Sequence, residues 1–373
     1  MQRSVFFRNS VYFCRYFFVK LMLRPQKRKK YTGKIIAGIL LIFLIAGGIT
    51  VYRFYECIYD VNLSVIHKDE PFLYIPTGSN FDDVCSLLAE TGLQDMKSFR
   101  WVAERMNYPA KVKFGRYRLT DGMSNIELVR MLRSGRQISV KVIFNNIRLD
   151  TQLAGAVTRN IEADSAGVMA LLVDSAYLAE RFNLTPRTVL SLFIPNTYEF
   201  FWDTSPKDFM DRMAKEYDHF WTESRRQKAR ETNLTPLQVT ILASIIEEET
   251  QMNNEKPTMA GVYINRLNMG MLLQADPTIK YAAGDFTIKR VLNNHKEIQS
   301  PYNTYMYAGL PPGPICIPSI ASIDAVLNYE KHDYLFFCAK EDFSGYHNFA
   351  RTLQQHNRNA QAYQKALNNM RIF

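Results

Sequence analysis

The feature that most constrains this chain is an apolar run without a charged residue, at residues 35–52, with the sequence IIAGILLIFLIAGGITVY. Its length is about that of a helix that crosses the hydrocarbon core of a bilayer. Basic residues precede it at 27–30 and at Lys34, which predicts that the N-terminus lies in the cytoplasm. The alternative is a cleaved signal peptide, but the run is long for one and no small-residue cleavage site follows it. We therefore expect a single uncleaved transmembrane helix at 35–52.

The charge distribution agrees with a membrane anchor and argues against a nucleic-acid partner. The chain has a formal net charge of +10, from 46 Lys and Arg against 36 Asp and Glu. Ten of the basic residues and none of the acidic residues lie at 1–34, so the rest of the chain is balanced. A nucleic-acid binder would carry the excess on its folded domain. A basic cytoplasmic tail at 1–34 indicates a membrane surface instead, and either Met1 or Met22 could be its first residue.

A carboxylate on an apolar helix face is the main chemical signal. Residues 235–250 read TPLQVTILASIIEEET, and Thr235 with Gln238 predicts a helix start of the capping-box type. At about 100° per residue, Glu249 falls within the stripe formed by Ile241, Leu242, Ile245 and Ile246. Glu247 and Glu248 fall outside it, and we expect Glu247 to be solvated or to orient a neighbour. An apolar setting raises a carboxyl pKa and prepares a general acid. The alternative is an ordinary charged helix end.

The periodicity predicts an α+β fold in two parts after the anchor. Residues 61–136 predict a small module with helices at 81–91, 98–106 and from Ser124, and a strand at 114–119. Residues 137–373 predict a mixed α/β domain whose elements include a long helix at 206–232, loops at 273–278 and 301–315, and a helical segment that opens at 345–349. The five cysteines form no CxxC pair or Cys/His cluster, and no glycine-rich phosphate loop occurs. We therefore expect no metal and no organic cofactor.

Several motifs in the second half of the chain resemble those of the MltG (YceG-like) family of endolytic murein transglycosylases. In order, they are ASIIEEET (243–250), INRL (264–267), LQADPT (273–278), YNTY (302–305), GLPPGPI (309–315) and GYHNF (345–349). Their order and spacing extend over more than a hundred residues, which makes the resemblance specific. Residues 115–117, GRY, also match the G-x-Y strand of that family's LysM-like subdomain. The resemblance covers nearly everything after the anchor.

The resemblance implies an inner-membrane protein with a LysM-like subdomain at 61–136 and a YceG-like catalytic domain at 137–373, both periplasmic. The implied reaction cleaves the bond between N-acetylmuramic acid (MurNAc) and N-acetylglucosamine (GlcNAc) within peptidoglycan strands and leaves 1,6-anhydro-MurNAc ends. It would terminate nascent strands beside peptidoglycan synthases. The general acid and base is Glu249, which the helical pattern also indicates. Candidate sugar-binding residues, whose amides and aromatic faces suit saccharides, are Gln274, Asp276, Tyr302, Asn303 and Tyr305; alternatively they build turns.

The chain departs from the family pattern at residues 190–198, which read LSLFIPNTY. The family's Glu and Asp are absent from that stretch, so we expect no essential acid there. Two other functions stay open. One is a membrane-tethered peptidoglycan-binding scaffold without catalysis, which a solvent-facing Glu249 would favour. The other is a muramidase-type hydrolase that uses Glu249 with Asp276 as a second carboxylate. His347 either binds substrate or satisfies a buried carbonyl.

Overall fold

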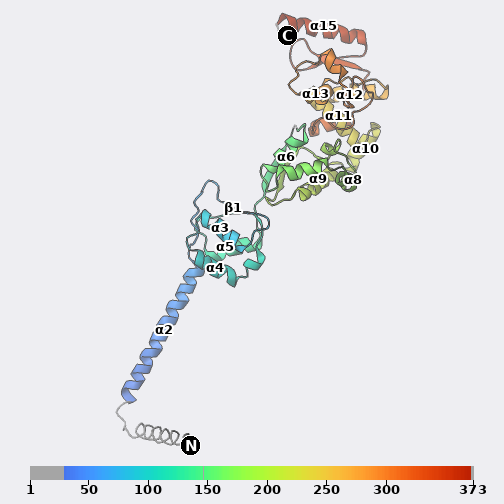
Figure 1. Cartoon of the computed structure of the whole chain (residues 1–373). Coiled ribbons are helices and arrows are strands. Elements are labelled where there is room, and N and C mark those ends of the chain that lie inside the picture. The colour runs from blue at the N-terminus through green and yellow to red at the C-terminus, as the bar shows by residue number, and fades with distance from the viewer. Residues whose placement is uncertain (1–28, 146, 371–373) are drawn as a thin grey trace, which may run out of the picture. The chain divides into compact units, whose positions relative to one another are not determined.

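The structure, a computed structural model, describes residues 29–145 and 147–370 (Figure 1). Most of the basic tail expected at 1–34, and with it the choice between Met1 and Met22, lies outside the described residues. The chain divides into two compact units. The first holds the described residues up to Pro71, with Asn80–Val112 and Leu119–Ser134. The second holds Phe72–Ser79, Lys113–Arg118 and the described residues from Gly135 onward.

The N-terminal helix α2 spans Lys29–Tyr59 and contains the apolar run. Its segment Gly33–Tyr59 is long and apolar enough to cross a membrane, and none of its most apolar stretch is buried in protein. Phe43 and Leu44 are 71% and 73% exposed, which suits contact with lipid and not with a protein core. The helix expected at 35–52 is confirmed and is longer at both ends. It fits a single-pass membrane anchor.

The first unit adds three helices to α2, of which two pack against its end and the third packs against one of those two. They are α3 (Phe81–Thr91), α4 (Met96–Arg105) and α5 (Asn125–Ser134), with a 3₁₀ turn η1 (Pro109–Lys111). α3 ends at Thr91, as expected, and the next residue must be glycine, because φ of Gly92 is 107° and a Cβ atom there would lie 1.9 Å from the Ser64 carbonyl oxygen. Phe54 of α2 stacks on Trp101 of α4 at 5.2 Å, and Asn125 Nδ2 donates to the Cys57 carbonyl oxygen at 2.8 Å. These contacts fix the last turns of α2 to this unit.

The second unit combines short antiparallel strand pairs with many helices. β1 (Phe72–Ile75) pairs with β2 (Gly115–Arg118), β3 (Val140–Phe144) with β4 (Asn196–Phe200), and β5 (Phe336–Ala339) with β6 (His347–Ala350). Its helices are α6 (Asp150–Thr158), α7 (Ser165–Val173), α8 (Ser175–Phe182), η2 (Val189–Leu192), α9 (Pro206–Phe220), α10 (Glu223–Glu231), α11 (Pro236–Glu249), α12 (Lys256–Asn268), α13 (Asp276–Ala283), η3 (Asn293–Glu297), α14 (Ile320–Leu327) and α15 (Leu353–Asn369). This mixture of helix and strand confirms the α+β expectation at that level.

The second unit has two hydrophobic cores. One surrounds the β3–β4 pair with α6, α7 and α9. The other surrounds α11 with α12 and α14, and includes Leu242, Ile245, Tyr263 and Val326, each no more than 1% exposed. Figure 1 shows α11, α12 and α13 as neighbours toward the C-terminal end of the chain. The second core therefore determines where the end of α11 lies.

Three expected elements of the second unit are wrong. The helix expected at 206–232 is interrupted, because Trp221 turns into the core at 1% exposure and the Thr222 side chain caps a new helix by accepting from Arg225 N. The loop expected at 273–278 already contains the first residues of α13, with Pro277 in its first turn. The segment from Gly345 forms β6 before α15 begins, since its backbone pairs with β5.

Candidate active site

Helix α11 is enclosed on all sides, which the sequence pattern did not predict. Its start is the expected capping box: Gln238 N donates to Thr235 Oγ1 at 3.3 Å, and Thr235 N donates to Gln238 Oε1 at 2.9 Å. From Val239 to Ile246 every residue is buried, including Thr240 and Ser244. Ser244 is satisfied, because Ile315 N donates to its Oγ at 3.0 Å. The helix is therefore a central core helix and not an amphipathic surface helix.

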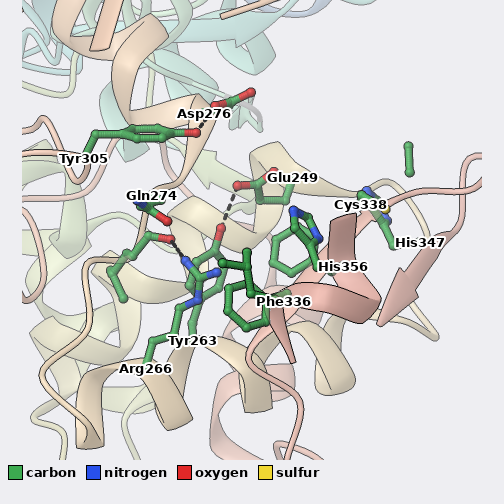
Figure 2. A pocket seen from close by; sticks show the side chains of 14 residues that line it. Glu249, Tyr263, Arg266, Gln274, Asp276, Tyr305, Phe336, Cys338, His347 and His356 are labelled. Carbon is green, nitrogen blue, oxygen red and sulfur yellow. Dashed lines mark hydrogen bonds between the residues drawn. The ribbon is translucent and has the colours of Figure 1, made fainter. Parts of the chain in front are cut away.

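Glu249 is the last residue of α11 and lies where the helix leaves the core. There it lines a pocket of about 380 Å³, a volume within the usual range of small-molecule sites. Side chains of α12, β5, β6 and α15 and of the loop before α13 form the other walls (Figure 2). In the view of Figure 2, Glu249 lies between the pair formed by Tyr305 and Asp276 and the side chain of His347. A ligand in this pocket would contact several elements at once.

The environment of Glu249 keeps its proton near neutral pH. Burial raises the pKa of this carboxyl to about 7, because the ionised form loses solvation, and the negative charge of Asp276 adds to the rise. The Tyr263 hydroxyl opposes it by donating to Glu249 Oε1 at 2.6 Å, which stabilises the carboxylate. A pKa near 7 lets one group both give and take a proton at physiological pH.

We expect the Tyr263→Phe substitution to raise the pKa of Glu249 above about 7. A hydrogen bond to an ionised group contributes about 1.5 kcal/mol, so the titration midpoint rises by roughly one pH unit. A ¹³C NMR titration of the Glu249 carboxyl carbon measures this shift directly. Tyr281→Phe, outside the pocket, serves as the control and leaves the midpoint unchanged. A midpoint that stays or falls in Tyr263→Phe contradicts the role of this hydroxyl.

Three of the expected sugar-binding residues line the same pocket as Glu249. They are Gln274, Asp276 and Tyr305. Gln274 adopts a left-handed backbone conformation with φ at 52°, and its N–H donates to the Thr304 carbonyl oxygen at 3.0 Å. The Tyr305 hydroxyl donates to Asp276 Oδ1 at 2.5 Å, so the two side chains form one polar edge. Their placement is compatible with saccharide binding.

Tyr302 and Asn303, candidates either for sugar binding or for turn building, do not line this pocket. Asn303 is fully buried, where its Nδ2 donates to the Lys296 and Ile298 carbonyl oxygens at 2.9 Å and its Oδ1 accepts from Tyr305 N at 3.0 Å. Tyr302 is 9% exposed and packs against Tyr281 with the ring centroids 4.7 Å apart. Both residues build the turn that presents Tyr305. This geometry fits the alternative interpretation, in which the two residues build a turn.

The other two glutamates of the EEE sequence, Glu247 and Glu248, also form hydrogen bonds with other side chains of the protein. Glu247, expected to be solvated or to orient a neighbour, accepts from Lys256 Nζ at 3.0 Å and from the hydroxyls of Ser319 and Ser322. These donors overcome the effect of burial and lower its pKa. Glu248 forms a two-bond ion pair with Arg148 at 2.8 and 2.9 Å. Of the three, only Glu249 lines the pocket, and its pKa is raised whereas that of Glu247 is lowered.

Sequence reasoning missed several residues that shape the pocket. Tyr263 reaches Glu249 from α12, and no local pattern could reveal this contact between two helices. Arg266, within the INRL motif, hydrogen-bonds to the backbone through its guanidinium. Its Nε donates to the Leu335 carbonyl oxygen at 2.6 Å, and its Nη1 donates to the Leu273 carbonyl oxygen at 2.7 Å. It thereby ties the loop before α13 to the start of β5. His356 of α15 stacks on Phe336 at 5.4 Å and also lines the pocket.

Comparisons with characterised proteins agree with the motif resemblance. An "Endolytic murein transglycosylase" of Bacillus subtilis is 30% identical over 305 residues, which cover 78% of this chain and 83% of that protein. A protein of the same name from Streptococcus pneumoniae strain D39 is 27% identical over 355 residues, and the match spans 86% of this chain but 63% of that longer protein. A crystal structure of a yceG-like protein from Listeria monocytogenes has 28% sequence identity and a TM-score of 0.52, and covers 77% of this chain and 97% of that one.

The family model described as "YceG-like family" matches residues 73–362, which is most of the chain. This range contains all the motifs noted in the sequence, the whole pocket and Glu249. Together with the extent of the match to the Bacillus protein, it confirms the resemblance, and the chain belongs to the YceG-like family.

Proposed function

We propose that this chain is an endolytic murein transglycosylase that cleaves the MurNAc–GlcNAc bond within peptidoglycan strands and leaves 1,6-anhydro-MurNAc ends. The observation that carries the proposal is Glu249, a carboxyl with a pKa of about 7 in an open pocket. Relatives of that name in Bacillus subtilis and Streptococcus pneumoniae support the substrate class. The match spans 63% of the length of the pneumococcal relatives.

In the proposed reaction Glu249 acts twice. Protonated Glu249 first gives its proton to the oxygen that joins MurNAc to GlcNAc, and the GlcNAc part leaves. The Glu249 carboxylate then takes the proton of the MurNAc 6-hydroxyl, whose oxygen bonds to C1 and closes the anhydro ring. The proton returns to Glu249 and no water is consumed. The Tyr263 hydroxyl stabilises the carboxylate between the two steps.

Gln274, Asp276 and Tyr305 are proposed to hold the saccharide. Amide and carboxylate oxygens accept from sugar hydroxyls, the Gln274 amide also donates, and the Tyr305 ring offers a face for a sugar. Tyr302 and Asn303 are proposed to act only through the turn they stabilise. No cofactor is required by this scheme.

A second candidate is a muramidase-type hydrolase, and Asp276 is the observation that favours it. Asp276 lines the same pocket as Glu249, so a second carboxylate is available to activate a water. Mass spectrometry of products from uncrosslinked glycan strands separates the two reactions, because an anhydro end is lighter than a reducing end by one water. We expect anhydro ends. Products with reducing ends and no anhydro ends would show that the enzyme is a hydrolase and not a transglycosylase.

A non-catalytic scaffold is the least supported function. It would need no proton-bearing carboxyl in a pocket, whereas burial raises the Glu249 pKa to about 7. Wild-type protein that binds glycan strands and yields no cleaved product of either kind would favour the scaffold.

The sequence limits of the two modules remain proposals. We propose a LysM-like subdomain at 61–136 and a YceG-like catalytic domain at 137–373. We also propose that the protein acts beside the peptidoglycan synthases that make the nascent strands. The strands β1 and β2 belong to the second compact unit. The LysM-like assignment therefore rests on the sequence resemblance and does not describe a separate folding unit.

We expect the anchor to cross the inner membrane, with the catalytic domain in the periplasm and the basic tail in the cytoplasm. Alkaline phosphatase, which folds only in an oxidising compartment, should be active when fused to the C-terminus. Removal of residues 35–52 is the control and should abolish that activity. An active cytoplasmic reporter and an inactive phosphatase on the full chain would show the opposite orientation.

A further inference from the structure

His347, which lines the Glu249 pocket, is paired with the carboxylate of Glu255 behind it. His347 Nδ1 lies 2.8 Å from Glu255 Oε2, and the side chains of His347 and Glu255 are 13% and 6% exposed. The same carboxylate accepts from the backbone N–H of His347 through Oε1 at 2.7 Å. Thr250, the residue after Glu249, donates its hydroxyl to Glu255 Oε2 at 3.3 Å. Hydrogen bonds therefore connect the pair to the end of α11.

The arrangement assigns the proton of His347. A carboxylate has no proton to give, so Nδ1 must carry the hydrogen that joins it to Glu255. In the neutral ring, Nε2 then bears a lone pair and is a hydrogen-bond acceptor. Within the described part of the chain no group hydrogen-bonds to Nε2, although His347 lines the pocket. This nitrogen is the part of the ring that remains for a ligand.

We propose that His347 is a substrate-contact residue whose Nε2 accepts a hydrogen bond from a saccharide hydroxyl beside the bond that Glu249 cleaves, and that Glu255 is the positioning residue that sets its tautomer. The proposal rests on the proposed function for the identity of the saccharide. In Figure 2, His347 lies on the opposite side of Glu249 from Tyr305. A sugar chain held at Tyr305 and at His347 would therefore cross Glu249.

His332 shows what a purely structural histidine looks like in this chain. Both of its ring nitrogens are used by backbone: Nε2 lies 2.8 Å from the Thr258 carbonyl oxygen, and Nδ1 accepts from Tyr334 N at 3.0 Å. It lines no part of the Glu249 pocket. His347 differs because one nitrogen is held by a buried carboxylate and the other is left to the pocket.

The Glu255→Gln variant tests the tautomer. The backbone N–H of His347 can only donate, so the Gln amide must turn its oxygen toward that group. The amide NH₂ then faces Nδ1, which must become an acceptor, and the proton moves to Nε2. The shape is kept, while the pocket nitrogen changes from an acceptor to a donor. We expect kcat/KM on uncrosslinked glycan strands to fall about ten- to hundredfold, as is usual when a buried polar group loses its partner.

The His347→Asn variant tests the contact between His347 and the saccharide independently of the tautomer. Asn can still donate to Glu255 through Nδ2, but it has no atom that replaces Nε2. We expect the variant to keep its thermal unfolding midpoint and to lose glycan affinity to a similar extent as Glu255→Gln. His332→Asn is the matched control, and it should lower the midpoint without changing affinity.

The measurements use the full-length protein in detergent micelles. ¹⁵N-histidine NMR reports the protonated nitrogen, since the chain has six histidines and the His347→Asn spectrum assigns the signal of His347. Glycan binding is measured in the Glu249→Gln background, so that it does not depend on turnover. We expect Nδ1–H in the wild type, Nε2–H in Glu255→Gln, and weaker binding in both test variants.

Three results would overturn the proposal, and the first two are a wild-type proton on Nε2, or a swapped tautomer in Glu255→Gln with binding and cleavage unchanged. Loss of stability in both variants with full activity of the folded protein would also overturn it, since the pair would then only fasten β6. If the single variant Glu249→Gln still cleaves glycan strands, that result counts against the proposed function. The tautomer and binding results for His347 would stand in that case.

Discussion

Glycan cleavage falls by about 10² to 10⁴ in the Glu249→Gln variant, the range expected when a general acid and base is removed. The amide is nearly isosteric with the carboxyl, so the pocket keeps its shape, but it cannot pass a proton. Turnover of uncrosslinked glycan strands, followed as anhydro ends by mass spectrometry, measures the loss. Glu248→Gln is the matched control on the same helix, because Glu248 pairs with Arg148 outside the pocket. Full activity in Glu249→Gln would remove this residue from the reaction.

Stability provides a second readout for the same variant. The pKa of Glu249 is raised from 4.5 to about 7 in the folded state, so the folded state binds the proton more tightly than the unfolded state. The ionised carboxyl therefore destabilises the fold fully above about pH 7, and this cost disappears below the unfolded pKa. Relative to the wild type, Glu249→Gln should become more stable as pH rises from about 4.5 to 7. A difference that does not change with pH in chemical unfolding would contradict the raised pKa.

The Lys256→Met variant is expected to lose about 3–5 kcal/mol of unfolding free energy, the usual cost of removing one partner from a buried ion pair. The Lys256 side chain is 4% exposed and its Nζ lies 3.0 Å from Glu247 Oε2. Without it, the Glu247 carboxylate stays in a site where its side chain is 17% exposed, with only hydroxyl and backbone donors from Ser319 and Ser322. Urea unfolding measures the difference. Lys331→Met, at an exposed lysine, should change it by less than about 0.5 kcal/mol.

The loss in Lys256→Met should also depend on pH. The pKa of Glu247 is lowered in the fold, so its ionised form stabilises the protein above the unfolded pKa near 4.5, and this contribution is lost as pH falls through the folded value. The gap between wild type and Lys256→Met therefore narrows at acid pH. The double variant Lys256→Met with Glu247→Gln should be less destabilised than the sum of the two single variants. A loss below about 1 kcal/mol at neutral pH would show that the pair is not important for stability.

The sequence alone determined elements whose causes are local. The span at 35–52 follows from composition, and α3 and the start of α11 follow from a glycine and a capping box that act within one turn. The identity of Glu249 as the candidate acid also came from the sequence, through motif and periodicity together. The break between α9 and α10 and the strand β6 escaped it. One depends on burial of Trp221, and the other on pairing with β5.

Only the tertiary structure decided how the three glutamates differ. The helical pattern separated an apolar side from a solvated side, but α11 is enclosed all around and no side of Val239–Ile246 faces water. What distinguishes the glutamates is their partners: Lys256 and two serines for Glu247, Arg148 for Glu248, and a tyrosine hydroxyl inside a pocket for Glu249. Lys256 and Tyr263 come from the next helix, α12, whereas Arg148 and the two serines lie far away in the chain. A periodicity gives the direction of a side chain, whereas its pKa depends on solvation and neighbouring charge, which exist only once those segments have packed.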